Sequence, residues 1–355
     1  MLDLLLVVVA FVVILVGSEL FTNGIEWFGQ RLGLAEGAVG SVLAAVGTAL
    51  PETIVPIVAI LFSGSDTVPT DADSIGIGAI LGAPFMLATL AMFVTGVAVL
   101  VRARGRGAND DMVVKAPVLL KDVGFFFAAY LVALGAAFLP AGADLARVAV
   151  ACALLAGYAI YVRSHLGAEA DIVAADLAAL RFSRFMGGAG AAGPPSRNVI
   201  NVQVLVALGL IVGGSVVFVD AIEGLAHSLS VAPLILALVV APIATELPEK
   251  LNSVIWVRAG KDTLAMGNIT GAMVFQACIP TTVGLVFAAD AWRVVPGSTA
   301  SLVAFTSAVF AFLSMAVIFV PLWRQGRLRG RGLLAGGLFY VAFLVLVVMV
   351  GTGAS

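Results

Sequence analysis

Ten apolar stretches long enough to cross a lipid bilayer recur along this chain, and they restrict its possible folds more than any other feature. A helix needs about 20 apolar residues to span the hydrocarbon core, and inside lipid every backbone polar group must be satisfied within the helix. We therefore predict an all-α polytopic membrane protein with ten transmembrane helices. They fall at about 2–28, 37–62, 75–101, 117–139, 145–163, 200–226, 231–257, 263–288, 298–322 and 333–351.

The composition excludes a soluble protein. Hydrophobic residues make up 61% of the 355 positions and charged residues only 11%, a balance typical of integral membrane proteins. The chain starts Met1-Leu2-Asp3 without the basic segment of a signal peptide, so we expect the first apolar run to remain as a helix. Cys152 and Cys278 lie in apolar runs, and we expect both to be buried free thiols.

The basic residues alternate between the loops that join the predicted spans. Sixteen of the nineteen Lys and Arg fall near 31, 102–121, 163–197, 258–261 and 324–331. The opposite loops carry only Arg147 and Arg293, and Lys250 lies inside a span. Because basic loops stay in the cytoplasm, we expect an even number of spans with both termini outside. The expected location is a prokaryotic plasma membrane.

One long polar segment, 164–199, divides the predicted spans into two sets of five. It is rich in Gly and Pro after residue 186 and has no sustained apolar face, which indicates a cytoplasmic linker. Residues 168–185 could form a short surface helix. We therefore divide the chain into a first five-helix repeat at 1–163, the linker, and a second repeat at 200–355.

The two halves are related in sequence. A shift of 197 residues places 17–52 on 214–249 without a gap, and thirteen of the thirty-six positions are identical. The matches include Glu26 with Glu223, Pro51 with Pro248 and Glu52 with Glu249, which similarity between apolar helices alone would not produce. Since five spans is an odd number, the second repeat must be inverted in the membrane. Inverted repeats with broken helices near the midplane are typical of transporters.

A charged hexapeptide, Thr245-Glu246-Leu247-Pro248-Glu249-Lys250, interrupts the seventh apolar run. A carboxylate at this depth costs about 2.5–3.5 kcal/mol, so a binding role is the default hypothesis. Pro248 removes a backbone donor, and we expect the helix to break there and release carbonyl oxygens. Carboxylates, hydroxyls and carbonyls are the ligands that hard cations such as calcium prefer.

Two pairs of motifs resemble those of a known family. Residues 47–52 (GTALPE) and 244–249 (ATELPE) resemble the paired G-T-S-x-P-E signatures of the sodium/calcium exchanger superfamily, also called cation/calcium antiporters. Residues 78–83 and 267–272 resemble that family's G-N-x-x-G-S motifs. The resemblance covers about 12–101 and 205–288 and implies cation exchange by alternating access. It also implies that Glu52 and Glu249 bind the ions with nearby hydroxyls and carbonyls.

Several positions depart from the family pattern. Leu87 and Gln276 stand where the family usually has Asn or Asp, and Ala49, Glu246, Ala83 and Ala272 occupy the serine positions. Oxygen ligands are therefore missing from the first repeat, so the resemblance does not carry the family's usual sodium and calcium stoichiometry over to this chain. Glu246 and Gln276 could compensate from the second repeat. The candidate cation ligands are Glu52, Glu249, Glu246, Gln276, Thr48, Thr245 and Asn268.

Some of these side chains have a structural alternative. Lys250 follows Glu246 by four residues, so it could simply form an ion pair that lowers the cost of burying Glu246, or it could alternate with a transported cation. Asn268 could bind an ion or form a hydrogen bond between helices. The Gly78/Gly82 and Gly267/Gly271 pairs have G-x-x-x-G spacing, which favours close approach of helices.

Other acidic and histidine side chains carry weaker signals. Glu26 and Glu223 could line an access route, but solvation at the helix ends explains them, Glu19 and Asp220 equally well. His165 and His227 fall near membrane edges or in the linker, where a proton relay is a minority interpretation.

The favoured function is a secondary active antiporter that exchanges calcium, or a related divalent cation, for sodium or protons. Closely spaced carboxylates repel, so protons can compete with the metal ion. A cation channel or a transport-inactive relative is the alternative, because of Leu87 and the missing serines. An intramembrane hydrolase using Glu246 and Glu249 is disfavoured, since they have no nucleophile or set of metal-binding histidines beside them.

We accordingly expect no enzyme activity and no cofactor beyond the transported cations calcium, sodium and protons. The expected partners are the lipid bilayer and inorganic cations, with no nucleic acid. The sequence does not determine the oligomeric state.

Overall fold

The computed structural model describes residues 2–31, 49–62, 71–106, 109–166, 179–184 and 195–352. Apart from two short strands, these ranges are helices joined by turns. The elements are α1 Leu2–Arg31, α4 Leu50–Phe62, α5 Asp71–Met86, the π-helix η2 Leu87–Ala91, α6 Met92–Arg106, β1 Asp111–Met112, α7 Ala116–Gly135, η3 Ala136–Phe138, α8 Asp144–Leu166, η4 Arg181–Arg184, α9 Arg197–Leu229, α10 Pro233–Thr245, α11 Leu247–Arg258, α12 Asp262–Phe287, α13 Thr299–Gln325, β2 Leu328–Arg329, α14 Gly330–Leu333 and α15 Ala335–Thr352.

Within the described ranges, eight helices are long and apolar enough to cross a membrane. The prediction of a mainly helical membrane protein is therefore confirmed. Two of the ten predicted spans do not appear as single long helices: only residues 49–62 of the span at 37–62 are described, and the span at 231–257 is divided into α10 and α11. The count of ten and the inverted relation of the halves stay predictions.

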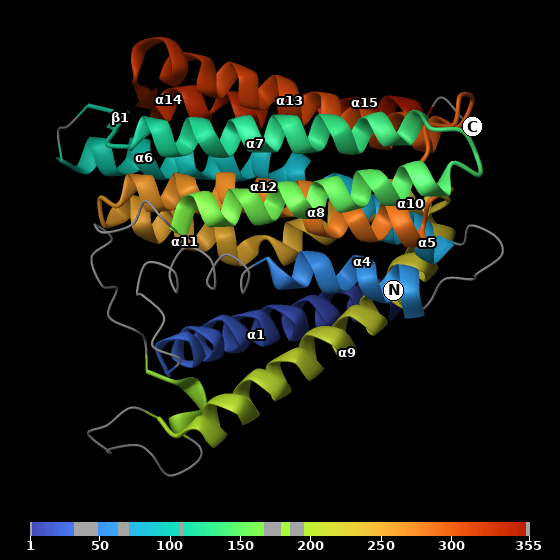
Figure 1. Ribbon diagram of the computed structural model, residues 1–355, viewed down its shortest axis with the longest axis horizontal. Coiled ribbons are helices and arrows are strands. Elements are labelled where there is room, and N and C mark those ends of the chain that lie inside the picture. The colour runs from blue at the N-terminus through green and yellow to red at the C-terminus, as the bar shows by residue number, and fades with distance from the viewer. Residues whose placement is uncertain are drawn as a thin grey trace.

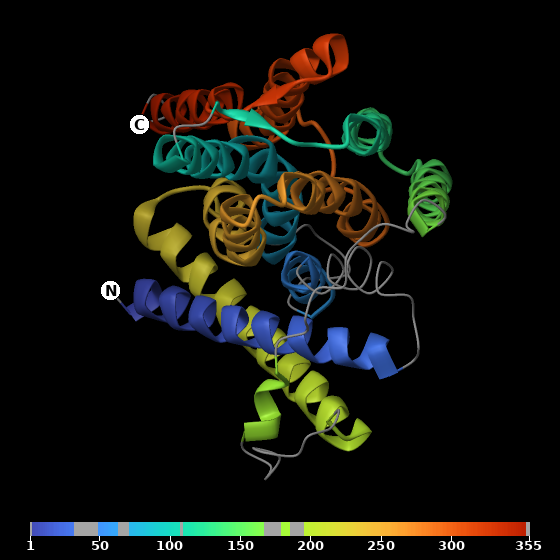
Figure 2. The ribbon, with the colours of Figure 1, turned by 90° about the vertical axis from the view of Figure 1, so that its left-hand side faces the viewer.

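The helices that open the two halves, α1 and α9, pack along each other and cross beside the bundle formed by the others (Figures 1 and 2). Glycines allow this approach: a Cβ at Gly17 would lie 2.8 Å from Ile211 Cγ1, and one at Gly214 would lie 2.8 Å from Ile14 Cγ1. Gly17 and Gly214 are equivalent in the sequence repeat. Equivalent residues thus form the two sides of one helix crossing.

A second close contact between the halves joins α5 to α10. A Cβ on Gly78 would lie 2.4 Å from the carbonyl oxygen of Leu234, and one on Gly82 would lie 2.2 Å from that of Leu238. The predicted role of this G-x-x-x-G pair is confirmed.

The second G-x-x-x-G pair does not make such a contact with any described residue. A Cβ on Gly267 would meet no described atom within 4 Å, and one on Gly271 would lie 3.4 Å from Tyr161 Oη, an ordinary contact. The repeat register pairs α10 with residues 36–48, which lie outside the described ranges.

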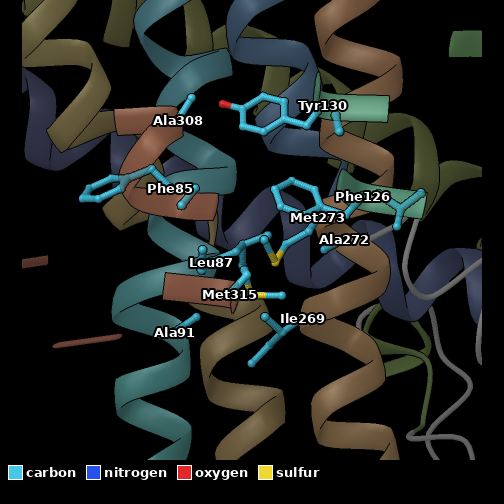
Figure 3. Packing of buried hydrophobic residues seen from close by; sticks show 14 of the residues in the cluster. Phe85, Leu87, Ala91, Phe126, Tyr130, Ile269, Ala272, Met273, Ala308 and Met315 are labelled. Carbon is cyan, nitrogen blue, oxygen red and sulfur yellow. The ribbon is translucent and has the colours of Figure 1, made fainter. Parts of the chain in front are cut away.

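Apolar side chains divide between a packed interior and an exposed outer surface. The largest buried cluster includes Leu87, Phe126, Ile269, Met273 and Met315 from four different elements (Figure 3). Large apolar side chains such as Leu2, Val101 and Leu338 are exposed, as expected of a surface that faces lipid. Cys278 is buried as predicted, but Cys152 is exposed, so that expectation was wrong. An apolar run in a bilayer does not reveal which of its faces is packed.

Polar contacts join several helix ends to the segment around β1. The two strands β1 and β2 pair antiparallel, with Asp111 opposite Arg329. Asp262 at the start of α12 accepts hydrogen bonds from the Arg102 guanidinium on α6 and from the backbone N–H of Val113.

Asp110 is buried in the same region and accepts hydrogen bonds from Arg331 Nε at 2.8 Å and Nη2 at 2.9 Å. Hydrogen bonding to Arg331 lowers the pKa of Asp110 from 3.8 to about 2. Figure 1 shows β1 at the opposite end of the bundle from the start of α1 and the end of α15.

The described part of the predicted linker lies against α1 and α9. The Arg181 guanidinium donates to Glu19 Oε1 at 2.8 Å, and the backbone N–H of Phe182 donates to Gln203 Oε1 at 2.9 Å. Residues 181–184 form the 3-10 turn η4. Most of the surface helix expected at 168–185 lies outside the described residues.

Candidate cation-binding site

The helix break that we expected at Pro248 occurs two residues earlier, at Glu246. Helix α10 ends at Thr245 and α11 begins at Leu247, and Glu246 between them has φ −91° and ψ 8°, outside the helical range. Pro248 has no N–H to donate to the preceding turn. The N–H of Glu246 still donates to the carbonyl of Pro242 at 3.2 Å, so the interruption is confined to about one residue.

The repeat-related glutamates occupy equivalent places in two helices. Glu52 is the third residue of α4 and Glu249 the third residue of α11. Both are buried, with exposed fractions of 3% and 0%. The first turn of a helix has unpaired N–H groups and a positive partial charge, which favours a carboxylate. The local fold therefore lowers the cost of placing both carboxylates in the interior.

Four buried ionisable side chains, contributed by both halves of the chain, interact electrostatically. Glu52 interacts with the charges of Glu249 and Glu246, and also with that of Lys250. Neither carboxyl oxygen of Glu52 forms a hydrogen bond with another described residue. Three buried carboxyl groups and one ammonium, from α4 in the first half and from the residues around the α10–α11 break in the second, therefore lie within electrostatic range of one another.

The Lys250 ammonium is fixed at the helix break. Lys250 Nζ donates to Glu246 Oε2 at 3.1 Å and to the carbonyl oxygen of Pro242 at 3.3 Å. The side chains of Lys250 and Glu246 are 7% and 0% exposed. The predicted ion pair is thus present, and it offsets part of the cost of burying Glu246.

Helix α12 supplies further polar groups, because it packs against both α4 and α11. Gln276 is fully buried, and its side-chain amide has no hydrogen-bond partner among the described residues. Asn268 Nδ2 donates to the backbone carbonyl of Glu249 at 3.4 Å, which is the hydrogen bond between helices that we considered as its alternative role. Thr245 is buried next to Glu246, and its hydroxyl donates to Ala241.

Two further positions belong to the first half of the chain. Thr48 lies outside the described residues. Leu87 begins the π-helix η2 and is fully buried in the apolar cluster with Met273 and Met315 (Figure 3). The first half therefore contributes Glu52 as its described carboxylate, whereas the second contributes Glu246, Glu249 and Gln276.

Sequence reasoning missed a second polar cluster around Asp122 on α7. This buried carboxylate accepts hydrogen bonds from Tyr161 Oη at 3.0 Å and from Thr270 Oγ1 at 2.7 Å, and His165 Nε2 lies 3.0 Å away. His165 thus packs within the helices rather than in the linker. A single Asp near the start of an apolar run was the available signal, but nothing in the sequence indicated its three partners.

The remaining acidic candidates that the structure describes have other surroundings. Glu19 forms an exposed ion pair with Arg181. The side chain of Glu26 is outside the described set, and Asp220 is exposed. Glu223 lies beside Asp71 and His227.

A comparison with family models supports the motif resemblance. The model described as "Sodium/calcium exchanger protein" matches residues 2–165 and 200–349, which is most of the chain. Among curated proteins, CaxA of Alkalimonas amylolytica, which is named as an antiporter, is 28% identical over 144 residues. That stretch covers 40% of this chain and 43% of the relative.

Solved structures share the fold at low sequence identity. The H+/Ca2+ exchanger CAX matches with a TM-score of 0.72 at 16% identity, covering 99% of this chain and 85% of that one. The sodium-calcium exchanger NCX_Mj matches with a TM-score of 0.54 at 16% identity, covering 97% and 98%. YfkE matches with a TM-score of 0.61 at 12% identity, covering 98% and 92%.

Proposed function

Because the chain belongs to the sodium/calcium exchanger protein family, we propose that it is a secondary active antiporter that exchanges calcium, or a related divalent cation, for protons or sodium. The observation that supports this proposal is that three carboxyl groups from two halves of the chain, those of Glu52, Glu246 and Glu249, are buried within electrostatic range of one another. Buried carboxylates that repel one another are stabilised by a bound cation or by protons. Either kind of ion lowers the cost of their burial.

The net charge of the site suits a divalent cargo. When Glu52, Glu246 and Glu249 are all deprotonated they carry three negative charges, and the Lys250 ammonium offsets one of them. One divalent cation, or two monovalent cations or protons, would balance the remaining two. Carboxylate and amide oxygens are the ligands that calcium prefers. In this proposal Glu52 and Glu249 bind the ion directly, with Glu246, Gln276, Thr245 and Asn268 as further ligands and Thr48 as a candidate outside the described residues.

Alternating access would follow from the paired helix starts. The N-termini of α4 and α11 belong to different halves of the chain, and each presents a glutamate to the same interior region. In the proposed arrangement of five-helix repeats at 1–163 and 200–355, joined by a cytoplasmic linker at 164–199, the two halves are inverted. Each half would then expose the shared ion to one side of the membrane. Both termini would lie outside.

One observation favours a second candidate, a relative that binds cations without exchanging them. Leu87, at the position where the family resemblance implies an oxygen ligand, is buried among apolar side chains. A site with ligands mainly from one half could hold an ion without passing it to the other side. Flux measurements separate the two candidates.

The deciding experiment uses purified protein in sealed vesicles with a calcium indicator inside. We expect calcium uptake when an opposing proton or sodium gradient is imposed, and little uptake when that gradient is collapsed with an ionophore. Running the two gradients separately identifies the driving ion. Calcium entry that is independent of both gradients would indicate a channel. Binding of calcium without any flux would indicate the transport-inactive relative.

A further inference from the structure

A second group of metal-ligating side chains lies away from the carboxylates at the helix break. Asp71 begins α5, and Glu223 and His227 lie one turn apart on α9. One ligand atom from each of the three residues falls within 4.8 Å of the other two. The group shares no residue with the site proposed for the transported cation.

The geometry is close to what a small divalent ion requires. A tetrahedral zinc site has metal–ligand bonds of about 2.0–2.2 Å, which separates its ligand atoms by roughly 3.3 Å. His227 Nε2 and Asp71 Oδ2 are already 3.1 Å apart. Glu223 is on the same helix face as His227. Small rotations of its side chain would bring its carboxylate oxygen to a similar distance from the ligand atoms of His227 and Asp71.

Charge and access also suit a cation. The side chains of His227 and Asp71 are 66% and 41% exposed, so an ion can reach them from solvent. A Cβ at Gly224 would lie 3.1 Å from Asp3 Oδ1, which places another carboxylate beside the same turn of α9. The contact between His227 and Asp71 accounts for two of these groups, and Glu223 adds a second carboxylate to the single imidazole.

We propose that Asp71, Glu223 and His227 form a binding site for a divalent transition metal such as Zn²⁺. One imidazole with two carboxylates is the ligand set of a borderline metal rather than of calcium, and water would complete the coordination. The bound metal bridges α5 to α9. It therefore fastens the pair formed by α1 and α9 to the main helical bundle, and it stabilises the folded protein.

The test is zinc titration calorimetry on the full chain, purified without a polyhistidine tag and kept in excess calcium. We expect one zinc ion per chain, with affinity reduced at least tenfold in His227→Ala and in Asp71→Asn. His165→Ala removes the chain's other histidine and should leave zinc binding unchanged. Zinc should raise the unfolding temperature of the wild type but not that of His227→Ala.

The proposed exchange site can be separated from this one in the same assay. The double variant Glu52→Gln/Glu249→Gln should bind zinc as the wild type does. As a second readout, Cu²⁺ bound to the wild type should show coupling to one imidazole nitrogen in electron paramagnetic resonance, and His227→Ala should lose it. Wild-type protein that binds no zinc, or zinc binding that survives His227→Ala and Asp71→Asn, would overturn the proposal whether or not the protein transports calcium.

Discussion

Glu52 and Glu249 each stand third in a helix that opens with a leucine and a proline, and each is buried within interaction range of the other. The residues 50–52 and 247–249 have the same sequence and are 197 positions apart. Both carboxylates thus lie in the same local structure, a first helical turn that contains a proline and whose free N–H groups favour negative charge. Each half of the chain thus contributes one buried glutamate from an identical Leu-Pro-Glu helix start.

Replacing either carboxylate by an amide tests the exchange proposal. We expect Glu52→Gln and Glu249→Gln each to reduce gradient-driven calcium flux by on the order of 100-fold. A lost charged ligand costs roughly 3 kcal/mol, and each 1.4 kcal/mol is a factor of ten. Vesicle flux is the measurement, and Glu19→Gln, at an exposed ion pair, is the matched control. Normal flux in either site variant, at equal protein content, would count against the proposal.

The Lys250 and Glu246 pair can be examined by a double-mutant cycle. Lys250→Met leaves the buried Glu246 charge without its ammonium partner, so we expect it to lower the free energy of unfolding by about 3–5 kcal/mol. Adding Glu246→Gln should recover most of that loss, because neither charge remains. Thermal unfolding in detergent measures both. Equal stability of Lys250→Met and the wild type would show that the pair does not stabilise the fold.

The same variant also bears on transport. If the ammonium alternates with the transported cation, folded Lys250→Met should change calcium affinity or the number of counter-ions exchanged per calcium. Unchanged calcium flux and exchange stoichiometry would reject this role and would show that Lys250 acts only as the ion-pair partner of Glu246.

The contact between Arg102 and Asp262 should be among the strongest polar contributions to stability. Asp262 is 1% exposed and Arg102 14%, and the carboxylate also accepts from the N–H of Val113. Asp262→Ala should lower the free energy of unfolding by about 3–5 kcal/mol, since it leaves a largely buried guanidinium unpaired. Asp290→Ala, at a solvent-exposed pair with Arg293, should change it by less than about 0.5 kcal/mol. Chemical denaturation of both variants provides the comparison.

Gly82 should not tolerate even one added methyl group. Its Cβ would lie 2.2 Å from the carbonyl oxygen of Leu238, so Gly82→Ala must push α5 and α10 apart. We expect a loss of about 1–3 kcal/mol or more in unfolding free energy. Gly124→Ala on α7 meets no described atom within 4 Å and should be neutral or stabilising by up to about 1 kcal/mol. A similar unfolding temperature for the two variants would contradict the close approach.

Asp110 should make stability depend on acid pH. Its pKa falls from 3.8 to about 2 on folding, so its contribution is complete above about pH 4 and is lost as the pH drops from 3.8 towards 2. Asp110→Asn should therefore be less stable than the wild type at pH 7, by about 1 kcal/mol for a partly solvated ion pair. At pH 3 the difference should be smaller. Urea unfolding at both pH values measures this difference in stability. A difference that is as large at pH 3 as at pH 7 would contradict the prediction.

Strong local signals made part of this structure predictable. The break at Glu246 followed from a proline and two carboxylates in an apolar run, and the contact at Gly78 and Gly82 followed from their spacing. The repeat also predicts that Glu52 and Glu249 share one binding site, and this stays a prediction. In each case a residue type that is expensive or unusual in a membrane helix marked the place.

Contacts between distant segments could not be read in the same way. Asp122 and His165 are 43 positions apart in the sequence, and Arg102 and Asp262 are 160 positions apart. No spacing rule links the partners in either pair. Cys152 was misassigned because lipid and protein interior are both apolar, and hydrophobicity alone cannot distinguish a packed helix face from one that meets lipid. The burial of Leu87 among apolar side chains likewise depends on packing between η2, α7, α12 and α13, which are far apart in the sequence.

The two close helix contacts have a consequence for how the protein is made. Gly17 and Gly214 join α1 to α9, and Gly82 joins α5 to α10, so each half of the chain completes the other's packing. When only the first 163 residues have been synthesised, α1 and α5 are present but their packing partners α9 and α10 are not. If the gene is divided so that the chain is split between residues 185 and 194, each fragment should be degraded when it is expressed alone. Both fragments should accumulate when they are produced in the same cell.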